Sequence, residues 1–128
     1  MDAEEAVRAW VEGWSRAWPA GDVDGVAALY AEGAVFRSHP FRDPQPPAEY
    51  ARWAFADPDE RLVECRFGDP VVGRERAAVE YWALVRRQDG AEATLAGVAV
   101  IRFGTDGRVV EQRDYWDLAE GRRLPNFH

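Results

Sequence analysis

The stretch that decides the fold is residues 76–118, RAAVEYWALVRRQDGAEATLAGVAVIRFGTDGRVVEQRDYWDL. Apolar and polar residues alternate along much of it with a period of two, which is typical of β-strands with one buried face. Asp89-Gly90 and Asp106-Gly107 interrupt the alternation, and such pairs favour the tight turns of antiparallel hairpins. The stretch therefore predicts three consecutive antiparallel strands, at residues 76–87, 94–103 and 108–118.

Upstream of this stretch the chain begins with helical patterns. From Ala3 to Trp18, apolar residues recur at spacings of three and four, as expected of an amphipathic helix. Pro19 and Gly21 interrupt this pattern, so we expect the helix to end at Trp18. Asp22 has the short acidic side chain of an N-cap, and it predicts a second, shorter helix that ends at Gly33.

The remaining segments complete an arrangement of helices followed by strands. We expect a short strand at 34–37, a proline-rich loop at 40–47, a third helix at 48–55 and a strand at 62–67. Ala77, Ala78 and Leu84 would also tolerate a helix in residues 76–87, but the hairpin signal that follows favours a strand. Helices first and an antiparallel meander afterwards indicate the α+β class. A chain of 128 residues fits one domain, residues 1–128.

Composition excludes several classes of protein. The 47% apolar content, with six tryptophans, is enough for a packed core, and the net charge of −7 opposes binding to nucleic acid. The acidic N-terminus is followed by no apolar signal-peptide segment, and no run of about 18 apolar residues is present to cross a membrane. We therefore expect a cytoplasmic protein that binds neither nucleic acid nor membrane. Cys65 is the single cysteine, so we expect a small core residue there and no disulfide within the chain.

Several short runs of sequence together resemble one known family. They are AGDVD at 20–24, ALYAEGAVF at 28–36, VIRF at 100–103, DGRVV at 106–110 and YW at 115–116. In their order and spacing they resemble nuclear transport factor 2-like proteins, and most closely the SnoaL-like branch, which includes polyketide cyclases and is similar to ketosteroid isomerase. The resemblance implies a cone-shaped fold in which a curved, mostly antiparallel sheet wraps three N-terminal helices around a deep apolar cavity. It also implies a homodimer.

His39 is the first candidate catalytic residue. It lies in the run His39-Pro40-Phe41, at the position where sequences similar to ketosteroid isomerase carry a carboxylate base before Pro-Phe. A histidine titrates near neutral pH and can serve as a base there; the alternative is a histidine that is hydrogen-bonded at the entrance of a loop. The resemblance places the two oxyanion-binding positions of ketosteroid isomerase at Trp14 and Ala99. Ala99 has no side-chain donor, which argues against steroid isomerisation by that mechanism.

Asp114 is the second candidate catalytic residue. Strand alternation places it on one face of the last strand, together with Val110, Gln112 and Trp116, and the resemblance implies that this face lines the cavity. A carboxylate in such a cavity is desolvated, so its pKa rises and it can act as a general acid or base. The alternative is a structural aspartate that is paired with an arginine or a backbone amide.

Large aromatic residues and two polar ones are the candidates for the cavity wall. The predicted wall residues are Trp14, Tyr30, Trp53, Glu80, Trp82, Gln112 and Trp116. Glu80 faces inward in one strand register, and a slip by one residue would place Tyr81 inside instead. Tryptophans at helical spacing are more often core residues than ligand contacts, although Trp and Tyr also suit the recognition of cyclic, partly oxygenated ligands.

We predict a small-molecule-binding protein whose partners are a small hydrophobic or cyclic ligand and a second copy of the chain. The favoured activity is that of a cofactor-independent isomerase, cyclase or dehydratase of a hydrophobic carbonyl compound, in which His39 and Asp114 take and return a proton. The alternative is a non-catalytic ligand-binding or dimerisation module of the same fold. We expect no cofactor, and with only two histidines, one of them the terminal His128, we expect no metal site.

Overall fold

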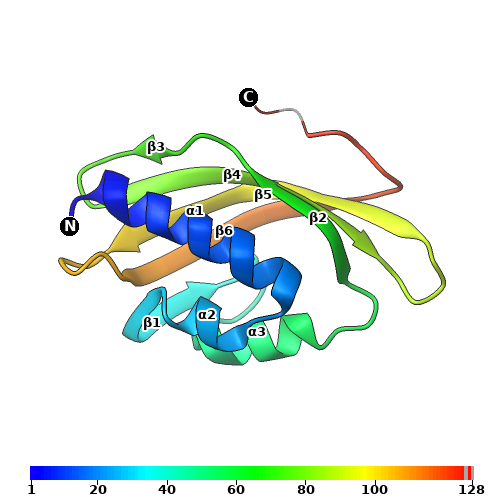
Figure 1. Ribbon diagram of the computed structural model, residues 1–128, viewed down its shortest axis with the longest axis horizontal. Coiled ribbons are helices and arrows are strands. Elements are labelled where there is room, and N and C mark those ends of the chain that lie inside the picture. Colours follow the sequence, from blue (N-terminus) through cyan, green and yellow to red (C-terminus); the bar gives the residue numbers. More distant parts are fainter. Residues whose placement is uncertain (126, 128) are drawn as a thin grey trace.

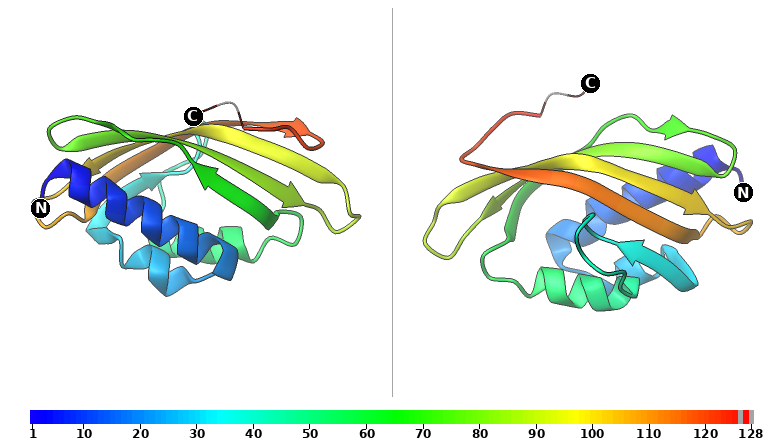
Figure 2. Two further views of the ribbon diagram at one scale, coloured as in Figure 1. Left: turned by 45° about the horizontal axis from the view of Figure 1, so that its top comes forward. Right: turned by 180° about the vertical axis from the view of Figure 1, so that it is seen from behind.

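The computed structural model describes residues 1–125 and residue 127, and it places three helices against one face of a curved sheet (Figure 1). The elements, in chain order, are α1 (Ala3–Ala20), α2 (Val23–Ala27), β1 (Tyr30–Arg37), α3 (Pro47–Phe55), β2 (Arg61–Phe67), β3 (Val71–Val72), β4 (Arg76–Arg86), β5 (Glu92–Phe103) and β6 (Val109–Glu120). Figure 2 shows how the long strands bend over the helices. The predicted α+β cone-shaped fold is confirmed.

The strands form one mixed sheet in the order β1-β6-β5-β4-β2, with β3 paired to one end of β4. β1 runs parallel to β6, and the other pairings are antiparallel. The β4–β5 hairpin keeps an unbroken register from Arg76 opposite Arg102 to Arg86 opposite Glu92. Both predicted Asp-Gly turns therefore lie between strands, whereas the two-residue strand β3 was not predicted.

Helix α1 lies across the concave face of the sheet (Figure 1). Its N-terminus is capped by the Asp2 carboxylate, which accepts a hydrogen bond from the Glu5 N–H at 2.8 Å. The helix continues two residues past its predicted end at Trp18, because Pro19 lies in the last turn and removes only one backbone hydrogen bond. Gly21 then ends the helix in the left-handed conformation, with a φ of 62°.

The second helix is shorter than the sequence predicts. α2 ends at Ala27, and by Tyr30 the chain already belongs to β1. The N–H of Val109, the first residue of β6, donates to the Leu29 carbonyl oxygen at 2.9 Å. The chain therefore pairs with β6 from a position where the sequence predicts that the helix continues. Gly33, with a φ of 75°, is therefore no helix terminator; it lies where the register between β1 and β6 is irregular.

The hydrophobic core lies between α1 and the concave face. Val7, Trp10 and Trp14 on α1 are buried in one cluster with Phe36 of β1 and Ile101 of β5. Burial of a large apolar side chain stabilises a fold by about 1.5–3 kcal/mol. This cluster therefore holds α1 to the sheet and fixes which of its residues face the strands.

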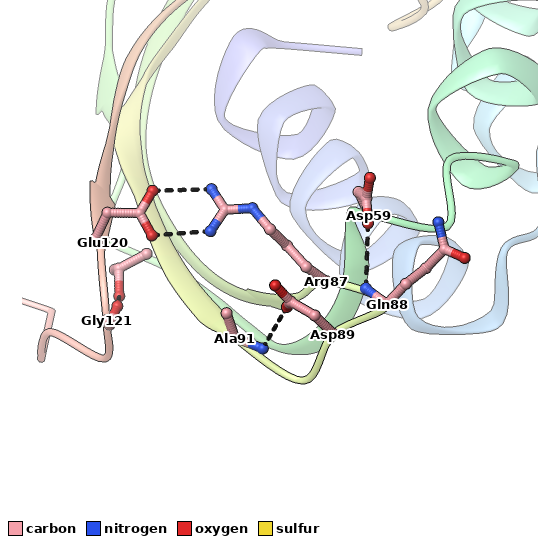
Figure 3. A network of polar contacts seen from close by, with 8 residues as sticks. Asp59, Arg87, Gln88, Asp89, Ala91, Glu120 and Gly121 are labelled. Atoms are coloured by element: carbon pink, nitrogen blue, oxygen red, sulfur yellow. Dashed lines mark hydrogen bonds and ion pairs between the residues drawn. The ribbon is translucent and has the colours of Figure 1, made fainter.

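A hydrogen bond joins the segment between α3 and β2 to the turn between β4 and β5. The Asp59 carboxylate accepts a hydrogen bond from the backbone N–H of Gln88 at 3.1 Å (Figure 3). Beside it, the Arg87 guanidinium donates two hydrogen bonds, at 2.8 and 3.0 Å, to the Glu120 carboxylate of β6. Glu60 follows Asp59 directly, so the contact between Asp59 and Gln88 also holds the backbone that carries Glu60 in place.

Gly97 lies at a close approach between β5 and β6, and we expect Gly97→Ala to destabilise the fold. A Cβ atom there would collide with the Tyr115 carbonyl oxygen and would lie 2.5 Å from the Cβ of Trp116. Because backbone atoms must shift, the free energy of unfolding should fall by roughly 1–3 kcal/mol, measured by urea denaturation. Gly73→Ala is the matched control, since its Cβ would meet only the Arg76 carbonyl oxygen at 3.6 Å. Equal losses in both variants would contradict the close approach.

Candidate active site

A narrow cavity lies between α1, α3 and the concave face of the sheet. Its volume is about 70 Å³, and most of its lining is aromatic. The lining residues are Trp10, Trp14, Trp18, Arg42, Tyr50, Trp53, Ala54, Phe55, Glu60, Phe67, Tyr81, Leu95, Gln112, Asp114 and Trp116. A dry cavity of about 150 Å³ holds benzene, so a ring-sized ligand would enter this cavity only if side chains at its mouth move.

Gln112 organises the polar groups at the inner end of the cavity. Its Oε1 accepts hydrogen bonds from Trp10 Nε1 at 2.9 Å and from the Tyr30 hydroxyl at 2.5 Å. The Tyr30 oxygen in turn accepts from Trp14 Nε1 at 3.1 Å, which leaves the Tyr30 proton for Gln112. Two donors thus identify the amide oxygen, so Nε2 points the other way and donates to Asp114 Oδ1 at 2.9 Å.

Asp114 is the buried acid of the cavity. Burial raises its pKa from 3.8 to about 7, and hydrogen bonds from Gln112 and Tyr81 oppose part of that rise. Among the described residues, no ion pair involves Asp114. Near neutral pH both forms of such a carboxyl group are populated, so it can take up and return a proton.

Three tyrosine hydroxyl groups around Asp114 stay protonated. Burial is the main cause that raises the pKa of Tyr30, Tyr50 and Tyr81 above the ordinary value, and the negative charge of Asp114 raises each of them further. Tyr50 and Tyr81 line the cavity themselves. The Tyr81 hydroxyl donates to Asp114, whereas the Tyr50 hydroxyl is a hydrogen-bond donor available in the cavity wall.

Arg42, Trp53 and Glu60 form the mouth of the cavity. Trp53 is half exposed. The Arg42 guanidinium carbon lies 5.0 Å from the Trp53 ring centroid and 5.3 Å from that of Trp116. Partial burial and the charge of Asp57 raise the pKa of Glu60, whereas Arg42 lowers it. The mouth thus combines one cation, one carboxylate and indole rings.

His39 does not line the cavity. Its Nδ1 accepts a hydrogen bond from the Phe41 N–H at 3.2 Å, and its ring packs edge-on against Trp116 with ring centroids 4.7 Å apart. Trp116 lines the cavity, and His39 lies behind it. The expectation that His39 shares the cavity with Asp114 is corrected accordingly. The alternative, a hydrogen-bonded histidine at the entrance of a loop, describes its contacts.

Most of the other predicted wall residues belong to the cavity region. Trp14, Trp53, Gln112 and Trp116 line the cavity, and Tyr30 lies behind Gln112. Trp14 and Trp53 come from the two helices that face each other across the opening, whereas Gln112 and Trp116 come from β6. The period-two pattern of the last strand therefore identifies residues that the fold brings to the cavity.

Glu80 and Trp82, in contrast, do not reach the cavity. Tyr81 pairs with Gly97 and points to the concave face, so its neighbours Glu80 and Trp82 point to the outer face of the sheet. Trp82 is buried there against the C-terminal segment, where its Nε1 donates to the Arg123 carbonyl oxygen at 2.7 Å. The register that places Tyr81 inside is thus the one that forms.

Several cavity residues were not predicted from the sequence. Trp10 lies four residues before Trp14 on the same helix face, so helical spacing was a signal that could have identified it. Arg42 and Glu60 lie in irregular segments, where no periodicity indicates the direction of a side chain. Whether Tyr81 faces the cavity depends on the strand register, which the sequence left open between two alternatives.

The comparisons with known proteins agree with this architecture. A model of the SnoaL-like domain matches residues 7–112 of the chain. The chain belongs to the SnoaL-like family. No curated protein matches it significantly.

Solved structures share the fold of this SnoaL-like protein. SalBIII, an epoxide hydrolase/cyclase-like enzyme with a role in pyran ring formation in the polyether salinomycin, is 17% identical, with a TM-score of 0.77 over 91% of this chain and 96% of that one. The Δ5-3-ketosteroid isomerase of Mycobacterium sp. is 20% identical, with a TM-score of 0.72 over 92% and 99%. Rv0760c of Mycobacterium tuberculosis, in complex with estradiol-17β-hemisuccinate, is 18% identical, with a TM-score of 0.73 over 91% and 98%. At these identities the likeness concerns the fold.

Other features of the described residues bear on alternative sites. Within residues 1–125 and 127, no three His, Cys, Asp or Glu side chains are grouped so that they could hold a metal ion. No helix in the same part of the chain is long and apolar enough to cross a membrane.

Cys65 is half-buried, and burial raises the pKa of its thiol to about 11, so the thiol stays protonated at neutral pH.

We expect Asp114→Asn to stabilise the protein above neutral pH. The pKa of Asp114 is about 7 in the folded protein, against an ordinary 3.8, so stability is lost as the pH rises through that interval and the native carboxyl must ionise. Since one pKa unit corresponds to about 1.4 kcal/mol, the loss has an upper limit of roughly 4 kcal/mol. Urea unfolding between about pH 4 and pH 8 should show a steeper decline in the wild type than in the variant.

Asp117→Asn is the matched control for this measurement, because Asp117 is exposed on the same strand. It should leave the pH dependence of the unfolding free energy as it is in the wild type. If Asp114→Asn also left that dependence unchanged, the raised pKa of Asp114 would be contradicted.

Proposed function

We propose that this SnoaL-like protein is a cofactor-independent isomerase, cyclase or dehydratase that acts on a small hydrophobic carbonyl compound. The observation that carries the proposal is a buried carboxyl group, that of Asp114, with a pKa of about 7 and a place in the lining of an aromatic cavity. General acid/base catalysis is most effective when the pKa of the catalytic group lies near the working pH. The similar folds of a cyclase-like enzyme and an isomerase support the proposal without supplying a substrate.

In the first step, the Asp114 carboxylate removes a proton from the carbon next to the substrate carbonyl group. Gln112 Nε2 holds Oδ1 of that carboxylate at 2.9 Å, so the base keeps a fixed orientation toward the ligand. The carbonyl oxygen becomes negative as the proton leaves. The protonated hydroxyl group of Tyr50, in the cavity wall, donates a hydrogen bond to that oxygen and stabilises the enolate.

In the second step, Asp114 returns the proton. Return to a different carbon gives an isomer, and transfer to a departing hydroxyl group gives water and a dehydrated product. If the enolate carbon instead attacks a second carbonyl group of the same molecule, a ring closes and the proton goes to the new alkoxide. Atoms and charge balance within one substrate in each case. The aromatic wall excludes water and orients a flat ligand against the carboxylate.

Ligand binding without chemistry is the second candidate function. The observation that favours it is the aromatic lining of the cavity, to which Trp10, Trp14 and Trp18 contribute flat apolar rings that suit a cyclic ligand. Asp114 would then serve as a hydrogen-bonding group for the ligand. Homodimerisation, which the family resemblance implies, stays a prediction under both candidate functions, as does a cytoplasmic location.

We expect the protein to catalyse exchange of the α-protons of cyclopentanone in deuterium oxide, measured by proton NMR. The carboxylate is the active form, so the rate should rise with pH and level off above about pH 7, the pKa of Asp114. Asp114→Asn removes the base and should lower the protein-catalysed rate by about 10²–10⁴-fold.

Two variants serve as controls for the exchange experiment. Asp117→Asn and His39→Ala should both retain the wild-type rate, because neither residue lines the cavity. Equal exchange by the wild type and Asp114→Asn would contradict the catalytic proposal. Saturable binding of cyclopentanone without any exchange would favour the ligand-binding function instead.

A further inference from the structure

Arg42 is the single cation among the described residues that line the cavity. Arg42 forms no ion pair with a carboxylate among the described residues, as is also true of eight of the other fifteen arginines. Its Nη1 donates one hydrogen bond, to Ser38 Oγ at 3.1 Å. A guanidinium group carries five N–H donors, so most of the donors of Arg42 have no acceptor in the described part of the chain.

Two indole rings and a set of hydrogen bonds hold Arg42 in place. Its guanidinium lies over the indole rings of Trp53 and Trp116, at 5.0 and 5.3 Å from their centroids, which is a favourable cation–π geometry. Trp116 Nε1 donates to the Ser38 carbonyl oxygen at 2.6 Å, and the Arg42 carbonyl oxygen accepts from Arg37 Nη1 at 2.8 Å. A half-buried, unpaired and positioned guanidinium is preorganised to bind an anion, and it suits the planar carboxylate in particular.

Arg42 and Asp114 act on the same wall of the cavity without pairing. The charge of Asp114 raises the pKa of both Tyr50 and Tyr81, and the charge of Arg42 lowers the pKa of both. No ion pair joins Arg42 to Asp114 among the described residues. Asp114 and Trp116 share one face of β6 and both line the cavity, and the Arg42 guanidinium lies over the Trp116 ring. A ligand that lies along Trp116 therefore extends from the carboxylate toward the cation.

We infer that Arg42 binds a carboxylate group of the substrate, so that the site prefers small oxo acids to neutral ketones. The carbonyl end would react at Asp114, and the carboxylate, a few bonds away, would pair with the guanidinium at the mouth. The reaction of the carbonyl end at Asp114 rests on the proposed function, whereas the binding of the carboxylate depends on Arg42 alone. Glu60 also lines the mouth, and its negative charge opposes the incoming carboxylate.

The test compares 4-oxopentanoate with 4-oxopentanamide, which has a similar shape and no charge, by isothermal titration calorimetry. The wild type should bind the acid about tenfold or more tightly than the amide, as expected for a charge-assisted hydrogen-bonded pair. Arg42→Gln should abolish this preference by weakening the binding of the acid alone. Arg42→Lys should keep a part of it, and Glu60→Gln should strengthen the binding of the acid.

Arg52→Gln is the matched control, since Arg52 is an exposed arginine of α3 that does not line the cavity, and it should keep the full preference. The inference is overturned if the wild type does not bind 4-oxopentanoate, if it binds acid and amide equally, or if the preference survives Arg42→Gln. Each of these results would show that Arg42 is not an anion site.

Exchange of the α-protons of 4-oxopentanoate separates this inference from the proposed function. Asp114→Asn should abolish the exchange and leave the preference for the acid intact. A wild type that prefers the acid but catalyses no exchange would support the carboxylate site and contradict catalysis by Asp114. Exchange without a preference for the acid would support Asp114 and contradict Arg42.

Discussion

The hydrogen bond from Gln112 Nε2 to Asp114 is the interaction on which the site depends. Trp10 of α1 and Tyr30 of β1 both donate to the amide oxygen of Gln112, so the amide cannot turn over without leaving two buried donors unpaired. The buried Gln112 side chain of β6 therefore joins α1 to β1. The hydrogen bonds that it makes within the core also orient the carboxylate of Asp114. The packing of the core thus determines both the orientation of the Asp114 carboxyl group and its raised pKa.

The electrostatics of the cavity oppose the stability of the fold, which supports the proposed function. A buried carboxyl without a cationic partner costs stability when it ionises, and a guanidinium placed against Asp114 would remove that cost by lowering its pKa. Arg42 lines the same cavity but is held by Trp53 and Trp116 instead. With no cation paired to it, the acid keeps a pKa of about 7, and we propose that Arg42 pairs with a ligand instead.

The fold was largely predictable from local patterns, and the site only in part. Period-two alternation and Asp-Gly turns are local signals. Alternation along the last strand grouped Asp114 with Gln112 and Trp116 on one face, and the family resemblance implied that this face lines the cavity. Glu80 and Trp82 were misplaced because the pairing of β4 with β5, and not their own segment, decides which face they take. His39 and Arg42 follow β1 in a segment without periodicity, where packing against distant residues sets the direction of each side chain. For the same reason α2 was predicted too long: its end is set by contact with the last strand.

The most direct test of this account is a pH titration of the aspartate side-chain carboxyl carbons by ¹³C NMR, with Asp114→Asn to assign the resonance. The account predicts one aspartate that titrates with a pKa of about 7 and whose signal is missing in the variant. If the signal that Asp114→Asn removes titrates instead near the ordinary value of about 3.9, Asp114 is not a base tuned to neutral pH, and the proposed catalysis would lose its foundation.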